Sequence, residues 1–117
     1  MTVSTFDAHV RVQAGIVMID LVGEINAFAE EALNQAYTQA EQADPSRIVL
    51  NFNQVRYINS TGIALIVGLL ARARNARRGL AVYGLSDHYQ EIFQITRLAD
   101  FMTIYPDETS AVQAAKQ

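Results

Sequence analysis

The chain has 117 residues, close to the commonest domain size, and this length predicts one domain over residues 1–117. Half of the residues are hydrophobic, which is enough to build a core and excludes a chain that is disordered throughout. The formal net charge of −3 argues against binding to nucleic acid or to an anionic membrane, because both attract proteins through an excess of basic residues.

The sequence contains no cysteine, which excludes disulfides, Cys-ligated metals and thiol catalysis. Small secreted domains usually carry disulfides, so we expect a cytoplasmic protein. The N-terminus does not resemble a signal peptide, and the apolar run at 63–71 is far shorter than the ~20 residues of a membrane span. His9 and His88 form no metal-binding pattern, and we expect no metal or other cofactor.

The first part of the chain predicts a hairpin followed by a helix. Residues 10–12 and 16–22 flank Ala14-Gly15, which favours two antiparallel strands. Asn26 is a good N-cap for a helix over 27–42, whose apolar residues recur at helical spacing. Its expected inner face consists of Phe28, Ala29, Ala32, Leu33, Ala36, Tyr37 and Ala40.

The middle of the chain predicts a buried strand over 47–52, a polar connector over 53–59 and a helix from Ser60 to about Arg77. This helix is apolar nearly all round, so we expect it to be deeply covered. Gly68 in its middle costs ~1 kcal/mol relative to Ala, and close approach of a neighbouring backbone would explain it. Later in the chain we expect strands at 80–85 and 103–105 and helices near 87–96 and 107–115.

The order of these elements predicts an α/β fold. Strands that alternate with helices favour a mostly parallel sheet, and the early hairpin adds an antiparallel edge, so we expect a mixed sheet of about five strands and about four helices. Sites in such folds lie beyond the carboxyl ends of the strands. The turns at 23–26, 53–62 and 84–87 are therefore the candidate site.

The segment Asn59-Ser60-Thr61-Gly62 lies where a strand gives way to the apolar helix. Free backbone N–H groups and the helix dipole favour an anion at this position. Phosphorylation of Ser60 would add about −1.5 to −2 charges there. The helix end tolerates this charge, but the charge would change the surface that a docked partner contacts. The alternative is that Ser60 or Asn59 only caps the helix.

Two short motifs occur in order along the chain, each between a strand and a helix. The first is Gly23-Glu24-Ile25-Asn26 after 16–22, and the second is Val55-Arg56-Tyr57-Ile58-Asn59-Ser60-Thr61-Gly62-Ile63 after 48–52, with Gly79-Leu80-Ala81-Val82 beyond the second helix. This combination resembles the STAS domain of bacterial anti-sigma factor antagonists over almost the whole chain. The resemblance implies a binding protein, not an enzyme, with no cofactor.

The resemblance also implies a regulatory cycle. The family's regulatory serine maps onto Ser60, and its partner is an anti-sigma factor that is also a serine kinase. In the unphosphorylated state the antagonist binds this kinase and frees the sigma factor, and a PP2C-type phosphatase reverses the phosphorylation. We expect a monomer or weak dimer whose partner-binding residues surround Ser60: Glu24, Asn26, Arg56, Asn59, Thr61 and Gly62.

The sequence departs from the family pattern at two positions. Asn59 stands where the family has Asp before the serine, and Asn26 stands where the family's first turn ends in Asp. Both residues keep an oxygen that can cap a helix, and both remove a negative charge near Ser60. A kinase that recognises the acid would therefore bind less well.

Two other interpretations of the whole chain stay open. The chain could be a scaffold or transport-complex STAS module without phosphorylation, or a STAS domain that binds a small ligand at the same strand ends. A Ser60, His88 and Asp87 hydrolase triad is disfavoured because Ile58 replaces the first glycine of a nucleophile elbow, and no phosphate-binding P-loop occurs. The basic residues Arg72, Arg74, Arg77 and Arg78 form either a solvated helix end or a contact for an acidic partner.

Overall fold

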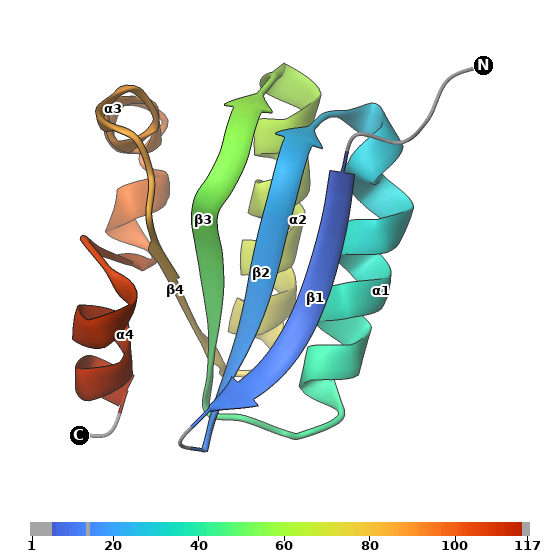
Figure 1. Ribbon diagram of the computed structural model, residues 1–117, viewed down its shortest axis with the longest axis vertical. Coiled ribbons are helices and arrows are strands. Elements are labelled where there is room, and N and C mark those ends of the chain that lie inside the picture. The colour runs from blue at the N-terminus through green and yellow to red at the C-terminus, as the bar shows by residue number, and fades with distance from the viewer. Residues whose placement is uncertain (1–5, 14, 116–117) are drawn as a thin grey trace.

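The computed structural model describes residues 6–13 and 15–115, which form a five-stranded sheet with helices on both faces (Figure 1). The strands are β1 (Phe6–Gln13), β2 (Ile16–Ile25), β3 (Arg47–Ile58), β4 (Gly79–Tyr83) and β5 (Thr103–Tyr105). The α-helices are α1 (Glu30–Glu41), α2 (Ser60–Asn75), α3 (Asp87–Ile95) and α4 (Glu108–Ala115), and two 3₁₀ turns are η1 (Ala27–Ala29) and η2 (Leu98–Asp100).

The strands lie in the order β1-β2-β3-β4-β5. β1 pairs with β2 antiparallel, and the remaining pairs are parallel. The predicted mixed, mostly parallel sheet with an antiparallel edge is therefore confirmed. The early hairpin and the strand at 103–105 are confirmed with it.

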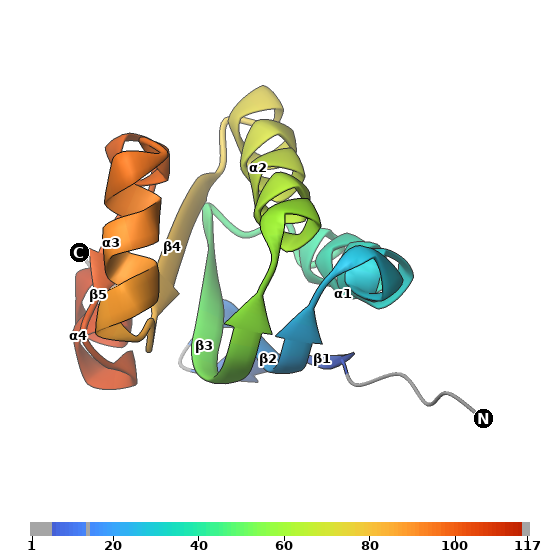
Figure 2. The same ribbon diagram turned by 90° about the horizontal axis from the view of Figure 1, so that it is seen from above.

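Alternating side chains of the sheet belong to two hydrophobic clusters, one on each face. Ile48 and Leu50 of β3 belong to the large core beneath α1, α2 and α3. Val49, between them, belongs to a smaller cluster that includes Ala111 of α4 on the other face. α1 and α2 lie on one face of the sheet and α4 lies on the opposite face (Figure 2). Successive residues of a strand point to opposite faces, so the apolar run from 48 to 50 serves both clusters.

The connector expected over 53–59 is wrong, because β3 continues to Ile58. Its second half pairs with β2 through Val22 opposite Gln54, Gly23 opposite Val55 and Glu24 opposite Tyr57. The register shifts twice along this pair, so β3 carries extra residues here, and Arg56 is one of them. Bulged, partly exposed strands tolerate polar residues, and that composition gave the segment the pattern of a loop.

The helix expected over 27–42 begins with η1 before α1 takes over. Leu33 and Tyr37 are buried as predicted, but Phe28 is 82% exposed. Its expected place on the inner face is wrong, because it belongs to a 3₁₀ turn, which has three residues per turn. The helical spacing that joined Phe28 to Leu33 therefore does not apply.

α2 ends at Asn75 and is not covered all round. Ile66, Leu69 and Ala73 are buried, whereas Val67 is 45% exposed and Ala71 is exposed. The expectation of a deeply covered helix is therefore wrong for one face. The explanation offered for Gly68 is wrong as well, since a β-carbon there would meet, apart from the backbone of α2 itself, no atom of the described residues within 4 Å. Among the described helices, none combines the length and apolarity that crossing a bilayer requires.

The arginines that follow the middle of α2 have different surroundings. Arg72 pairs with Glu41 and lies over the Tyr37 ring, 4.6 Å from its centroid. Arg78 donates to the Pro45 carbonyl at 2.7 Å, and only 11% of its side chain is exposed. Arg78 therefore ties the end of α2 to the turn before β3, and the interpretation as a solvated helix end is wrong for this residue.

Candidate functional site

The candidate site lies at the carboxyl ends of β2 and β3, where Ile25 is paired with Ile58. After each strand the chain turns into a helical segment that begins with asparagine. The Asn26 Oδ1 accepts a hydrogen bond from the Phe28 N–H at 2.9 Å, so the predicted cap is confirmed. The Asn59 Oδ1 accepts one from the Gly62 N–H at 2.8 Å. Two capped N-termini therefore start from adjacent strands.

Ser60 is the first residue of α2, and it is exposed. Asn59 performs the capping, so the Ser60 hydroxyl is not used for it. Among the described residues, neither this hydroxyl nor the N–H of Ser60 or Thr61 has a hydrogen-bond partner. The first turn of α2 also contains no acidic residue. The end of the helix thus presents a free hydroxyl and free N–H groups where the dipole favours negative charge.

Gly62 allows α2 to begin directly against the ends of the two strands. It is buried, and a β-carbon would lie 2.0 Å from the Ile25 carbonyl oxygen and 2.8 Å from the Ile58 Cγ2. The same Ile25 oxygen accepts a hydrogen bond from the Asn59 N–H at 3.2 Å. The start of α2, and with it Ser60, is therefore held by β2 as well as by β3.

The remaining predicted residues lie around this turn. Glu24 is half-buried and pairs with Tyr57 in the sheet, Thr61 is exposed, and Arg56 is exposed on the bulged part of β3. Arg56 forms no ion pair with another residue in the described part of the chain. It is therefore available to a phosphate or to an acidic group of a partner.

Two exposed aromatic side chains belong to the same segments and were missed from the sequence. Phe28 is in η1, which contacts α2, and Tyr57 is 53% exposed near the end of β3. Phe28 lies in a helical pattern that indicates a buried residue, so the sequence carried no signal for its exposure, whereas Tyr57 lies in the segment 53–59 that the sequence predicted as a polar connector. Exposed aromatic rings beside free polar groups are typical of a surface that binds another protein.

Tyr89 of α3 also contributes to the site. β4 ends at Tyr83 opposite Asn51, so beyond Asn51 no strand among the described residues pairs with β3 on that side. The Tyr89 hydroxyl lies there, where it accepts a hydrogen bond from the Ile58 N–H at 2.8 Å and is 3.4 Å from the Ile58 carbonyl oxygen. This contact was not predicted from the sequence. The turn at 84–87 thus reaches the site through α3, which Ser86 caps.

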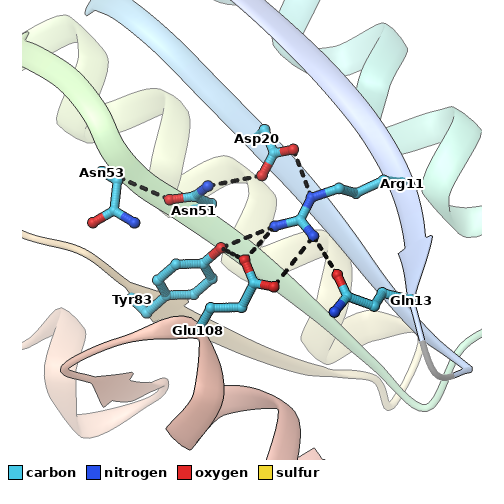
Figure 3. A network of polar contacts seen from close by, with 7 residues as sticks. All are labelled: Arg11, Gln13, Asp20, Asn51, Asn53, Tyr83 and Glu108. Carbon is cyan, nitrogen blue, oxygen red and sulfur yellow. Dashed lines mark hydrogen bonds and ion pairs between the residues drawn. The ribbon is translucent and has the colours of Figure 1, made fainter.

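A separate polar network lies on the face of the sheet that α4 covers (Figure 3). The Arg11 guanidinium donates to Asp20 at 2.7 Å and to Glu108 of α4 at 2.6 Å. The Tyr83 hydroxyl donates to Glu108 at 2.8 Å, and the Asn51 amide donates to Asp20 at 2.8 Å. The hydrogen bonds from Arg11 and Tyr83 hold the pKa of Glu108 below its usual range. The network attaches α4 to the sheet and does not include Ser60.

The described residues contain no group of three or more His, Asp and Glu side chains that could hold a metal ion. His88 is exposed and packs edge-to-face on the Tyr89 ring, with 4.8 Å between the centroids. The site therefore presents the exposed hydroxyls of Ser60 and Thr61 at a helix N-terminus, with charged side chains and two exposed aromatic rings around them.

Comparison with known proteins identifies the family. The STAS domain matches residues 7–111, nearly the whole chain. The chain belongs to the STAS domain family. A curated relative of this STAS chain is an anti-sigma-B factor antagonist of Staphylococcus aureus, 32% identical over 82 residues that cover 70% of this chain and 76% of the relative.

Solved structures share the fold of this STAS domain. An anti-sigma factor antagonist from Mycobacterium paratuberculosis aligns with a TM-score of 0.83 at 19% identity, covering 96% of this chain and 95% of that one. The Bacillus cell fate determinant SpoIIAA in its phosphorylated form aligns with a TM-score of 0.69 at 23% identity, covering 93% of this chain and 97% of that one. The predicted STAS-type fold is therefore confirmed.

Proposed function

We propose that this STAS domain is an anti-sigma factor antagonist, a protein-binding switch that sequesters an anti-sigma serine kinase and is turned off by phosphorylation of Ser60. The observation that carries the proposal is the exposed Ser60 hydroxyl on the first residue of α2, which, like the N–H groups beside it, has no hydrogen-bond partner in the described part of the chain. The name of the Staphylococcus aureus relative supports the general role.

The geometry accounts for both states of such a switch. Without phosphate, a partner docks on the ends of β2 and β3, where Phe28 and Tyr57 offer apolar surface and Glu24, Asn26, Arg56, Asn59 and Thr61 offer polar groups. A phosphoryl group on Ser60 accepts hydrogen bonds from the free N–H groups, so the fold survives the modification. The new charge and bulk lie within the docking surface, and binding weakens. A PP2C-type phosphatase then restores the binding state.

The test uses the purified chain and anti-sigma kinases from the same organism, incubated with ATP. We expect one phosphoryl group by intact mass, mapped to Ser60, and none on Ser60→Ala; Thr109→Ala, exposed on α4, is the matched control and keeps its modification. Ser60→Asp should weaken binding to the unmodified kinase by at least roughly tenfold, or ~1.4 kcal/mol, with an unchanged circular dichroism spectrum. Phosphate on another residue, or equal binding by Ser60→Asp, contradicts the switch.

A further inference from the structure

A second surface lies at the far end of α2. Between α2 and the segment that follows α3 there is a groove of about 330 Å³. Its walls are apolar, from Val67, Leu70, Ala71, Leu98 and Phe101. Val67 is 45% exposed and Phe101 is 53% exposed, so this apolar surface is open to solvent. α2 rises ~1.5 Å per residue, which places Arg74, beside the groove, ~21 Å along the axis from Ser60.

The groove lies in a strongly basic part of an acidic chain. Arg74 and Arg97 line it, and Arg97 forms an ion pair with Asp100 at 2.6 Å. Arg74, Arg47 and Asp100 line an adjoining polar hollow of about 440 Å³. Six of the nine basic residues of the chain are in α2 or around this end of it: Arg47, Arg72, Arg74, Arg77, Arg78 and Arg97. Within the described ranges, Arg74 and Arg77 have no ion-pair partner. The surface therefore carries unneutralised positive charge beside an apolar groove.

Gly68 gives an independent reason to regard this face as functional. Gly68 shares the exposed side of α2 with Ala64, Val67 and Ala71. A glycine inside a helix costs ~1 kcal/mol relative to Ala, and the space around its missing β-carbon is open. Packing within the described chain therefore does not account for it. Small residues on one side of a helix allow a second helix to approach closely.

We propose that this face of α2 and the adjoining groove bind an acidic amphipathic helix of a protein partner. One apolar side chain of that helix occupies the groove, its backbone lies over Gly68, and a carboxylate pairs with Arg74. A membrane surface fits less well, because the apolar surface is concave and the Arg74 guanidinium covers the Phe101 ring at 4.9 Å from its centroid. The inference does not depend on phosphorylation of Ser60.

The test selects phage-displayed random peptides of about a dozen residues on the full chain. We expect enrichment of peptides in which acidic residues (Asp or Glu) and apolar residues (Leu, Ile or Phe) recur at helical spacing. A synthetic copy of an enriched peptide should shift the NMR signals of Val67, Ala71 and Leu98. Gly68→Leu should raise the melting temperature of the chain yet lower its affinity for that peptide at least tenfold. Arg74→Gln should weaken it and reduce its salt dependence. Gln35→Leu, on the exposed side of α1, is the control and leaves binding unchanged.

The Gly68→Leu result separates binding from folding, because a more stable variant that binds less well has lost a contact and not its structure. Ser60→Asp should bind the peptide as well as the unmodified chain does. The proposal is overturned if no peptide is enriched, if the enriched peptides are basic, or if Gly68→Leu binds them normally. A membrane contact would replace it if no acidic peptide is selected and the chain instead sediments with vesicles that contain 30% phosphatidylserine. In that case Arg74→Gln should no longer sediment with the vesicles.

Discussion

The α-carbon of Gly62 faces the carbonyl oxygen of Ile25 so closely that a β-carbon would lie 2.0 Å from it. The first turn of α2 therefore rests on the end of β2, although α2 follows β3 in the chain. This contact fixes where the helix begins, and hence where Ser60 meets the solvent. A second glycine in the same helix, Gly68, has no such contact.

The two glycines of α2 should respond in opposite ways to alanine. Gly62→Ala should destabilise the fold by more than ~2 kcal/mol, because the carbonyl of Ile25 is backbone and can move only with β2. Gly68→Ala should stabilise it by up to ~1 kcal/mol through helix propensity. Urea unfolding measures both. Equal effects of the two substitutions would contradict the close packing at Gly62.

Asn59 should contribute to stability through its cap. Asn59→Ala leaves the Gly62 N–H without its acceptor and should cost ~1 kcal/mol. Asn59→Asp keeps the acceptor and should be at least as stable, because the added charge lies at the positive end of α2. Thermal melts of the three proteins test this order. Under the proposed switch, this variant should also be phosphorylated faster by a kinase that recognises an acid before the serine.

Tyr89 should hold the end of β3 through its hydroxyl alone. Tyr89→Phe keeps the ring and leaves the Ile58 N–H without its acceptor, so we expect a loss of ~1 kcal/mol. Hydrogen exchange at the Ile58 amide should accelerate more than exchange in the middle of β3. Tyr57→Phe, whose ring is 53% exposed, is the control and should leave both properties nearly unchanged. If exchange at Ile58 stays slow, another group satisfies that N–H.

The ion pair between Arg11 and Glu108 should make the free energy of unfolding depend on pH in the acidic range. Hydrogen bonds from Arg11 and Tyr83 lower the pKa of Glu108 in the folded chain. Its contribution is therefore complete above the unfolded pKa, ~4.3, and is lost as pH falls through the lower folded value. Glu108→Gln should thus be less stable than the unmodified chain at neutral pH, by no more than ~1 kcal/mol because the carboxylate is partly exposed.

Denaturant titrations at neutral pH and near pH 3 check this prediction. The difference between the two proteins should shrink at the lower pH. The exposed Glu91→Gln variant should show no comparable change and serves as the control. A difference that stays the same at both pH values would mean that Glu108 acts through packing and not through its charge.

Periodicity and capping residues predicted much of this molecule because they act over a few neighbouring residues. The alternation of strands and helices, the cap at Asn26 and the placing of Ser60 at the start of α2 all follow from local chemistry. The polar residues of 53–58 were misleading because local patterns do not include the neighbouring strand. A strand that pairs through bulges has the composition of a loop, and only its pairing with β2 identifies it as a strand. The exposure of Phe28 and of one side of α2 depended on what packs nearby.

The sequence by itself determined the α/β order, the family resemblance and the serine at a helix start, because these depend on residue type and spacing along the chain. Only the tertiary structure decided that Gly62 rests on the Ile25 carbonyl, that Tyr89 closes the open side of β3, and that Arg74 and Arg97 lie beside one apolar groove. These contacts join residues that are distant in sequence, and which of them form depends on how the helices pack across the sheet.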